Sequence, residues 1–198
     1  MSMEIELKAH IDNHEALKNL LAEKAEYLSA FEKEDRYYFL PEQPYRFPSG
    51  VRVRREKRTF TDGTEKSTSI VTYKEKMVRD GIEVNDEREF EVQSTEEFEE
   101  FLDVMRFKPG TSKKKRGWAF CRDGITAELV EVEGLGWFVE LEIIVKSSHA
   151  DVIDTVKNLE ETFADERNRL LGFLDSLGVS RESIESRFYS QMINCPHS

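Results

Sequence analysis

The sequence has little that would divide the chain or place it in a membrane. Its 198 residues contain no proline-, glycine- or serine-rich stretch that reads as a linker, and no convincing internal repeat. No segment stays apolar for the roughly 20 residues that a membrane helix needs, and the N-terminus lacks an apolar signal segment. We therefore expect one domain over residues 1–198, with a core of about residues 3–192, in the cytoplasm and not in the membrane.

Cysteine is also scarce, and acidic residues outnumber basic ones. The two cysteines have neither the spacing of a metal site nor that of a disulfide framework. The formal net charge is -11, which argues against a nucleic-acid partner because phosphate backbones require a basic face. A small anionic ligand remains compatible with this charge, since the basic residues are concentrated in 52–58 and 113–116 and local charge governs the binding of a small ligand.

Short alternating segments separated by turn signals predict a mainly antiparallel β protein. Asp62-Gly63, Asp80-Gly81 and Asp123-Gly124 have the composition of hairpin turns, and consecutive hairpins imply antiparallel pairing. Strands are expected at 3–11, 35–40, 51–58, 69–77, 82–92, 113–121, 125–132 and 137–145. Helices are expected after the caps Asn13 and Ser94, from Ser148 to about residue 177, and after Ser180. The predicted fold class is α+β: a closed antiparallel β-barrel, or tunnel, of about eight strands with flanking helices.

Charged side chains recur at every second position of these strands. Glu4, Glu6 and Lys8 share one face of the first strand, whereas Ile5 and Leu7 share the other. The same alternation occurs at Arg52 and Arg54, at Thr72 and Lys74, at Glu87, Glu89 and Glu91, at Lys114 and Arg116, and at Glu140 and Glu142. A solvated sheet face explains any one of these strands. A solvated face explains the whole set less well, because Glu140 and Glu142 lie in the most hydrophobic of the predicted strands.

Such a set of charges favours metal and polyphosphate chemistry. Carboxylates gathered from several strands repel one another unless a cation lies between them, and oxygen-only ligands suit Mg²⁺ or Mn²⁺. Converging Arg and Lys side chains suit a multiply charged oxyanion. A cavity with an acidic half and a basic half is suited to a triphosphate.

The ordered motifs resemble those of the CYTH domain, or triphosphate tunnel metalloenzyme, superfamily. They are E-x-E-x-K at Glu4–Lys8, R-x-R at Arg52–Arg54, T-x-K at Thr72–Lys74, E-x-E at Glu89–Glu91, K-x-R at Lys114–Arg116, and the closing V-x-G-L-G-x-F-x-E-x-E at Val132–Glu142. Residues Ser186–Met192 are also similar to the family's final S-Y-x-x-L-L helix. The resemblance implies an eight-stranded antiparallel tunnel that binds a triphosphate and one or two divalent ions.

The resemblance also implies roles for individual residues. The expected metal ligands are Glu4, Glu6, Glu89, Glu91, Glu140 and Glu142, and the expected phosphate-binding residues are Arg52, Arg54, Lys74, Lys114 and Arg116. Lys8, Glu6 and Glu142 are the expected catalytic residues. The implied cofactor is Mg²⁺ or Mn²⁺, and the implied partner is a small-molecule triphosphate: ATP, tripolyphosphate or thiamine triphosphate. Neither a nucleic acid nor a membrane is expected as a partner, and a homodimer is left open.

Within the superfamily, Asp35-Arg36-Tyr37-Tyr38 looks like the D-x-Y-F of class IV adenylyl cyclases, which implies conversion of ATP to cyclic AMP and pyrophosphate. Hydrolysis of inorganic or thiamine triphosphate in the same tunnel is one alternative, and a non-catalytic nucleotide- or polyphosphate-binding protein is another.

One position departs from the family pattern. Val130 stands where the family usually has Asp. Glu128, on the same face, could substitute for the missing carboxylate, whereas Glu131 would point away. If Glu128 does not substitute, Val130→Asp is expected to raise activity.

Overall fold

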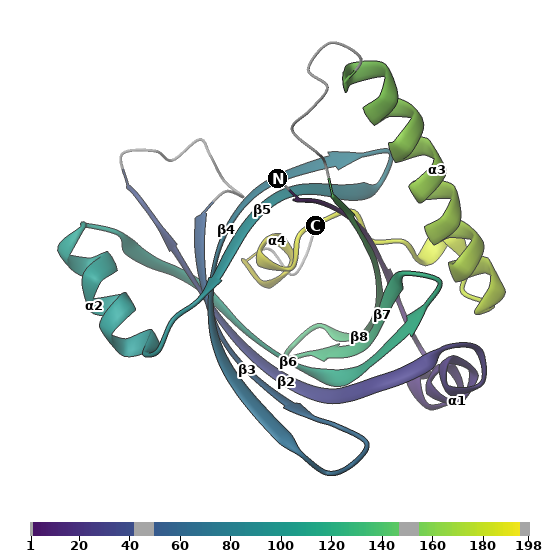
Figure 1. Cartoon of the computed structure of the whole chain (residues 1–198), viewed down its shortest axis with the longest axis horizontal. Helices are drawn as coiled ribbons and strands as arrows, with labels where there is room; N and C mark the ends of the chain where they lie inside the picture. The colour runs from purple at the N-terminus through teal and green to yellow at the C-terminus, as the bar shows by residue number, and fades with distance from the viewer. Residues whose placement is uncertain (1, 42–49, 147–154, 195–198) are drawn as a thin grey trace.

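Eight strands and four α-helices account for most of the residues that the structure describes. The computed structural model describes residues 2–41, 50–146 and 155–194 (Figure 1). The strands are β1 (Ser2–His10), β2 (Glu26–Phe39), β3 (Gly50–Thr59), β4 (Glu65–Arg79), β5 (Ile82–Glu91), β6 (Lys108–Arg122), β7 (Ile125–Val132) and β8 (Gly136–Lys146). The helices are α1 (His14–Lys24), α2 (Thr95–Val104), α3 (Thr155–Ser176) and α4 (Tyr189–Asn194), with a 3₁₀ turn at Arg181–Ser183. Within these ranges, no helix combines the length and apolar character that crossing a bilayer requires.

The strands pair antiparallel in the order β1-β5-β4-β3-β2-β6-β7-β8. The two ends of this order also pair, because Ile5 of β1 lies opposite Val84 of β5 on one side and opposite Ile143 of β8 on the other. The sheet therefore returns on itself as a barrel (Figure 1). In this ring β1 and β2 are separated by three strands in either direction, so they belong to opposite walls. The predicted α+β class with an antiparallel sheet is confirmed.

Two hairpins show the predicted turn chemistry. Asp80 and Gly81 have φ values of 51° and 78°, and Asp123 and Gly124 have 51° and 77°. Two successive left-handed residues match the right-handed twist of the flanking strands, and Asp-Gly tolerates that conformation best. These two turns set the registers of β4 with β5 and of β6 with β7.

Three strands, β2, β4 and β6, are several residues longer than predicted. β2 was expected from Asp35 but begins at Glu26, so residues 26–34 also belong to this strand. Similarly, β6 was expected from residue 113 but begins at Lys108. The helix expected after Ser180 is only the 3₁₀ turn, and the expected helix start at Ser148 falls outside the described residues.

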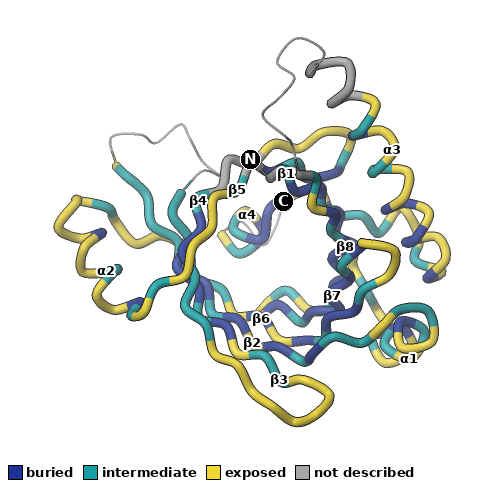
Figure 2. The backbone as a smooth tube through the Cα atoms, in the orientation of Figure 1, coloured by how far each residue is buried: buried dark blue, intermediate teal, exposed yellow. Residues whose placement is uncertain are grey.

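The main hydrophobic core lies outside the barrel, between its wall and helices α1 and α3 (Figures 1 and 2). Ile5 and Leu7 of β1 pack into this core with Leu21 of α1 and with Leu170 and Leu174 of α3, and all five are at most 1% exposed. Because strand side chains alternate, this packing turns the charged residues of β1 to the barrel interior.

One end of the interior is apolar. Val130 and Phe138 cluster there with Phe31 and with Tyr189 and Met192 of α4, and Figure 1 shows α4 within the outline of the ring. The chain before α4 is tied to the first strand, since the backbone N–H of Glu185 donates to the Lys8 carbonyl at 2.9 Å. The interior is thus charged over most of its length and closed by an apolar cluster at this end.

Candidate active site

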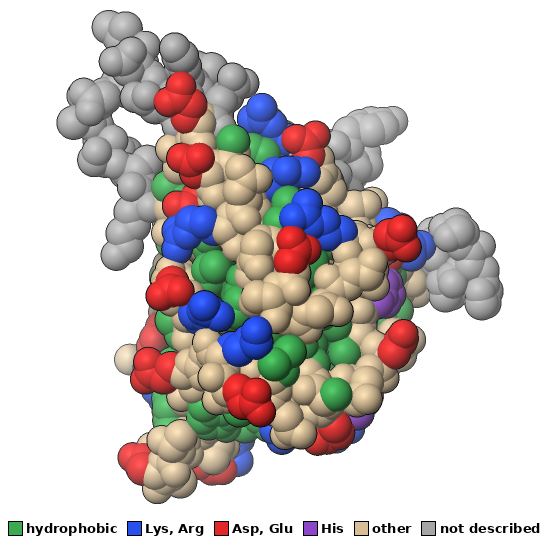
Figure 3. Space-filling model, turned by 90° about the vertical axis from the view of Figure 1, so that its right-hand side faces the viewer, with side chains coloured by type: hydrophobic (Ala, Val, Ile, Leu, Met, Phe, Trp, Pro, Cys, Tyr) green, Lys and Arg blue, Asp and Glu red, His purple; other side chains and the backbone are tan. Residues whose placement is uncertain are grey.

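An interior cavity of about 480 Å³ is lined by residues from all eight strands and from α4. Its acidic lining residues are Glu4, Glu6, Glu56, Glu83, Glu87, Glu89, Glu91, Glu128, Glu140 and Glu142, and its basic ones are Lys33, Arg52, Arg54, Arg58, Lys66, Lys113 and Lys115. On the outer face that bears α3, the described acidic and basic side chains are interspersed and form no single basic patch (Figure 3). Inside the barrel, by contrast, charged side chains from every strand surround one cavity.

One wall of the cavity carries a row of carboxylates on three adjacent strands. Glu6 of β1 lies opposite Glu83 of β5 and opposite Glu142 of β8. Like charges directly opposite one another destabilise a sheet, so this row requires positive charge nearby. Lys8 supplies some of it through an ion pair with Glu83. The next inward residue, Glu4, accepts a hydrogen bond from the side-chain amide of Asn85 at 3.2 Å.

The opposite wall is basic and is organised by a buried carboxylate. Arg54 donates two hydrogen bonds to Asp35, at 2.6 and 2.9 Å, and the Lys113 ammonium lies 3.5 Å from the same carboxylate. Asp35 is 0% exposed. Burial opposes its ionisation, but the charge and hydrogen bonds of Arg54 outweigh burial and hold the pKa of Asp35 well below its usual range. Asp35 therefore acts as a fixed anchor for two basic side chains.

Arg52 presents an unsatisfied donor beside this anchor. Its Nη2 donates to the Thr72 hydroxyl at 2.8 Å and lies 3.4 Å from a Glu89 carboxylate oxygen. Its Nε is buried and has no hydrogen-bond partner. A buried N–H without an acceptor costs about 1–3 kcal/mol, and more in a charged group. An anionic oxygen in the cavity would remove that cost, which marks this wall as suited to an anion.

Two buried ion pairs connect strands across the interior. Lys33 contacts both oxygens of Glu128 at 2.6 and 2.7 Å, and Lys115 contacts both oxygens of Glu140 at 2.6 and 2.9 Å. Burial opposes ionisation of Glu140, but the Lys115 charge outweighs burial and lowers the pKa of this carboxyl. Burial lowers the pKa of the Lys33 ammonium in spite of Glu128. These pairs neutralise much of the charge next to the apolar end.

Residues 2–189 match the sequence pattern of the CYTH domain. The chain belongs to the CYTH domain family. An adenylate cyclase candidate from Methanocaldococcus jannaschii is 24% identical over 192 residues, which are 96% of this chain and 98% of that protein. A Pyrococcus horikoshii protein of known structure is 28% identical with a TM-score of 0.71, covering 95% of this chain and 98% of its own. An adenylyl cyclase candidate from Hippeastrum, whose structure is described as revealing a dominant triphosphatase activity, is 16% identical with a TM-score of 0.61, covering 98% and 96%.

CYTH enzymes are generally dependent on a divalent metal, and the donor chemistry of the acidic wall fits such an ion. Glu6, Glu83 and Glu142 occupy neighbouring register positions, with Glu4 next along β1, and all offer only carboxylate oxygens, the ligands of Mg²⁺ and Mn²⁺. Among the described residues, no three acidic, histidine or cysteine side chains are already grouped closely enough to hold a metal. The row therefore offers carboxylate oxygens of the kind that a divalent ion requires, but they are not gathered into a coordination geometry.

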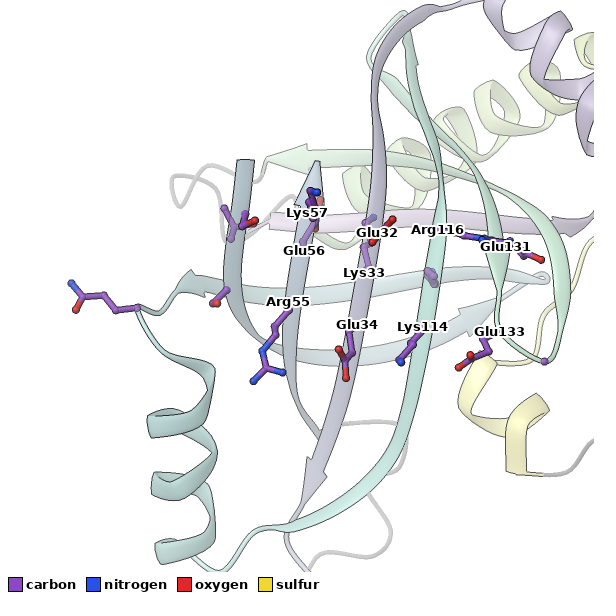
Figure 4. A pocket seen from close by; sticks show the side chains of 16 residues that line it. Glu32, Lys33, Glu34, Arg55, Glu56, Lys57, Lys114, Arg116, Glu131 and Glu133 are labelled. Carbon is purple, nitrogen blue, oxygen red and sulfur yellow. The ribbon is translucent and has the colours of Figure 1, made fainter. Parts of the chain in front are cut away.

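The predicted phosphate-binding role of Lys114 and Arg116 is wrong. Arg116 is 72% exposed and pairs with Glu131 at 2.5 Å on the outer face of the barrel. Lys114 and Arg116 line a second pocket, of about 1010 Å³, on this outer face (Figure 4). The inward-facing residues are Lys113 and Lys115. Because strand side chains alternate, a shift of one residue in the motif reverses the face of each side chain.

Glu89 and Glu91 were predicted as metal ligands but lie away from the acidic row. Both line the cavity, yet Glu89 is six positions along β5 from Glu83, which is about 20 Å of strand. Its carboxylate instead accepts from the Thr72 hydroxyl at 3.0 Å and lies beside Arg52. Their position gives no support to a shared metal site with Glu6.

Lys8 and Lys74, the remaining predicted basic site residues, lie on β1 and β4. Lys8, predicted as catalytic, is 2% exposed and paired with Glu83, and its ammonium lies 5.4 Å from the centre of the Tyr189 ring. The Lys8 ammonium therefore lies between a carboxylate of the acidic row and the Tyr189 ring. The β4 position of Lys74 pairs with Gly50 and Glu87, but the side chain of Lys74 lies outside the described residues.

Four residues line the cavity but were not predicted from the sequence as site residues: Lys33, Glu83, Lys113 and Lys115. For Lys33 a signal was present, since Ser29, Phe31, Lys33 and Asp35 alternate along β2, but the strand was expected to begin only at residue 35. For Lys113 and Lys115 no signal was available, because three consecutive lysines do not indicate which of them point inward.

Val130 lies on the inner face but does not line the cavity. It is 0% exposed and packed in the apolar cluster with Phe138 and Tyr189. Glu128, two residues earlier, does line the cavity. The structure therefore gives no opening at position 130 for a metal or substrate, and the expectation that Val130→Asp raises activity loses its structural basis.

Proposed function

We propose that this protein is a divalent-metal-dependent enzyme that acts on the triphosphate group of a small molecule, with ATP, converted to cyclic AMP and pyrophosphate, as the first candidate substrate. The observation that carries this proposal is the division of the cavity. Carboxylates on β1, β5 and β8 form one wall, and guanidinium and ammonium groups on β2, β3 and β6 form the opposite wall. A triphosphate with bound divalent cation carries the complementary arrangement of charge.

In this proposal the basic wall binds the phosphates and the acidic wall holds the metal. Arg52, through its unpartnered Nε, and Arg54 and Lys113, both oriented by Asp35, would contact phosphate oxygens. Glu6 and Glu142, together with neighbouring carboxylates, would hold Mg²⁺ or Mn²⁺. When bound, such an ion supplies polarisation of the attacking hydroxyl group or water.

The same residues allow two reactions. In cyclisation, the ribose 3′-oxygen bonds to the α-phosphorus while the bond from that phosphorus to the pyrophosphate oxygen breaks. In hydrolysis, a water oxygen bonds to the terminal phosphorus while the bond from that phosphorus to the bridging oxygen breaks, which releases orthophosphate and leaves the diphosphate. The Asp35-Arg36-Tyr37-Tyr38 pattern and the Methanocaldococcus relative support cyclisation. The similar fold of the Hippeastrum protein supports hydrolysis of inorganic or thiamine triphosphate as the second candidate.

Separation of products distinguishes these candidates. The purified protein is incubated with ATP, tripolyphosphate or thiamine triphosphate in the presence of Mg²⁺ or Mn²⁺. Cyclic AMP with pyrophosphate identifies a cyclase, and orthophosphate identifies a triphosphatase. Binding of all three without any product identifies the third candidate, a non-catalytic binding protein, and overturns the enzyme proposal. The cytoplasmic location and the homodimer stay predictions.

The metal part of the proposal rests on Glu142 and is tested with a matched pair of variants. Glu142→Gln should raise the metal concentration needed for half-maximal activity at least tenfold, the loss typical for disturbed metal sites. It should not weaken the fold, because it removes one of several neighbouring negative charges. Glu131→Gln, on the outer face, is the control and should leave the metal requirement unchanged. Identical metal titrations for the two variants would mean that Glu142 is not a ligand.

A further inference from the structure

Tyr189 has an unusual environment for a residue of the apolar cluster. Its side chain reaches from α4 into the lining of the charged cavity, although it is only 5% exposed. The Phe138 ring lies edge-on to it at a centroid distance of 5.0 Å. Tyr189 therefore lies at the boundary between the apolar end of the barrel and the charged cavity.

Three ammonium groups surround the Tyr189 ring. The Nζ atoms lie 4.6 Å (Lys115), 5.1 Å (Lys113) and 5.4 Å (Lys8) from its centre, within the range of about 6 Å at which a cation is attracted to an aromatic face. One aromatic ring thus contacts lysines from both walls of the cavity. It holds their charges close together in a space where they would otherwise repel one another.

The Tyr189 hydroxyl is buried and has no hydrogen-bond partner. Burial is the largest cause that raises the pKa of Tyr189, and the charge of Glu140 and the attraction between this carboxylate and the hydroxyl add to it. The contact with Glu140 nevertheless falls outside the geometry of a full hydrogen bond. Buried polar groups without partners are rare in native proteins, and each requires an explanation. A phenol is a hydrogen-bond donor at neutral pH, and an oxygen of a bound anion would supply the missing acceptor.

The position of this hydroxyl is well determined by the surrounding chain. Ile184 forms a β-bridge with Ala9, and the side chain of Gln191 accepts a hydrogen bond from the Phe188 backbone N–H at 2.8 Å. Met192, in the turn that follows, is buried in the apolar cluster. At the end of α4 the side-chain amide of Asn194 donates to the Thr111 hydroxyl at 3.0 Å. These contacts hold α4 in place, so the ring does not depend on a ligand for its placement.

We propose that Tyr189 is a substrate-contacting residue: its hydroxyl donates a hydrogen bond to a phosphate oxygen of the bound triphosphate, while its ring positions the ammonium groups of Lys113 and Lys115 against the same anion. This assignment rests on the proposed function, because it takes a polyphosphate as the ligand of the cavity. It extends the phosphate-binding surface from the strands to the C-terminal helix.

Two variants separate the hydroxyl from the ring. Tyr189→Phe removes only the oxygen and keeps the ring among the lysines, whereas Tyr189→Leu removes both. The probe is inorganic tripolyphosphate, with its dissociation constant measured by calorimetry, and thermal unfolding is followed with and without this probe. Tyr27→Phe is the control, because Tyr27 packs edge-on against Phe120 in the outer core and not in the cavity.

The expected results for Tyr189→Phe have opposite signs in the free and the bound protein. Without ligand, its melting temperature should equal or exceed that of the wild type, because an unsatisfied buried hydroxyl is removed. Its affinity for tripolyphosphate should fall roughly tenfold or more, the loss expected for one hydrogen bond to a charged group. The stabilisation by ligand should shrink in parallel. Tyr189→Leu should lose more affinity than Tyr189→Phe, since the lysines also lose the ring.

Other outcomes would overturn the assignment. If Tyr189→Phe binds tripolyphosphate like the wild type and Tyr27→Phe, the hydroxyl does not contact the ligand, whatever Tyr189→Leu does. If the wild type itself does not bind tripolyphosphate while remaining folded, the proposed function fails and this inference fails with it. The first result leaves the proposed function intact, so the two failures are distinguishable.

Discussion

The inner and outer faces of strands β2, β3 and β6 carry similar side chains in very different surroundings. Inside, Arg54 makes two hydrogen bonds to an Asp35 that is 0% exposed. Outside, the next residue, Arg55, contacts a Glu96 whose side chain is 68% exposed. Both faces therefore have ion pairs, and composition alone does not distinguish them.

The comparison shows that enclosure, not charge, defines the site. A buried pair that loses one partner leaves an uncompensated charge at a cost of about 3–5 kcal/mol, whereas an exposed charge that loses its partner is solvated by water. The inner pairs thus hold their side chains in place around the cavity. The outer pairs help to keep the strand faces hydrated.

The largest effect is expected from an unpaired charge on the inner face. Val130→Asp should lower the free energy of unfolding by about 4 kcal/mol or more, because a carboxylate would be placed among apolar side chains without a partner. Activity should not rise. Val130→Thr, nearly the same size but uncharged, is the control, with a cost of about 1–3 kcal/mol. Urea unfolding measures both. A Val130→Asp protein as stable as Val130→Thr would show that this end of the barrel is open to solvent.

The next effect compares a carboxylate inside with one outside. Asp35→Asn should cost about 3–5 kcal/mol of stability, because Arg54 keeps its charge in the interior without its main counter-ion. Glu131→Gln should change stability very little, since its partner Arg116 is 72% exposed. Equal urea midpoints for the two variants would remove the distinction between the faces.

Adjacent lysines sharpen the comparison in terms of binding. Lys113→Met should weaken tripolyphosphate binding roughly ten- to a hundredfold, which corresponds to about 1.5–3 kcal/mol for a hydrogen bond with a charged group. Lys114→Met should bind within about twofold of the wild type, because exposed charges act weakly at a distance in salt. Calorimetric titration measures both. If Lys114→Met loses more tripolyphosphate affinity than Lys113→Met, the assignment of Lys113 to the inner face of β6 is wrong.

The smallest effect is the acid dependence of stability. The folded protein holds the pKa of Asp35 below its ordinary value, so the unfolded chain binds more protons as the pH falls. The stability from this group is therefore complete above an ordinary carboxyl pKa of about 4 and is lost at lower pH. Unfolding free energies measured from about pH 6 to pH 2 should fall less steeply for Asp35→Asn than for the wild type. Parallel curves would mean that Asp35 titrates normally.

Much of the architecture followed from local sequence patterns. Asp-Gly turns and period-two alternation predicted the hairpins, and the alternation in Glu4 to Lys8 predicted which side chains of β1 point inward. Asn13 and Ser94 cap α1 and α2 as expected, each accepting from a backbone N–H three residues later. These features are predictable because their determining interactions lie within a few residues.

Errors occurred where the determining interaction was distant in sequence. The first half of β2 was missed because Leu28 lies seven residues after Leu21, a spacing that also fits a continuation of α1. Only pairing with β3 and β6 fixes these residues as a strand. The metal grouping of Glu89 with Glu6 failed because the sequence does not show how far along β5 the contact with β1 extends. That contact ends at the pair Ser2–Glu87.

The sequence by itself determined the alternation of charged and apolar residues, the turns and the motifs that mark a CYTH chain, because each depends on the short-range geometry of a strand or turn. Only the tertiary structure decided which of Lys113, Lys114 and Lys115 face the cavity, that Asp35 anchors Arg54, and that α4 brings Tyr189 against the lysines. These facts depend on register and on the closing of the ring, which bring side chains together from strands far apart in the chain.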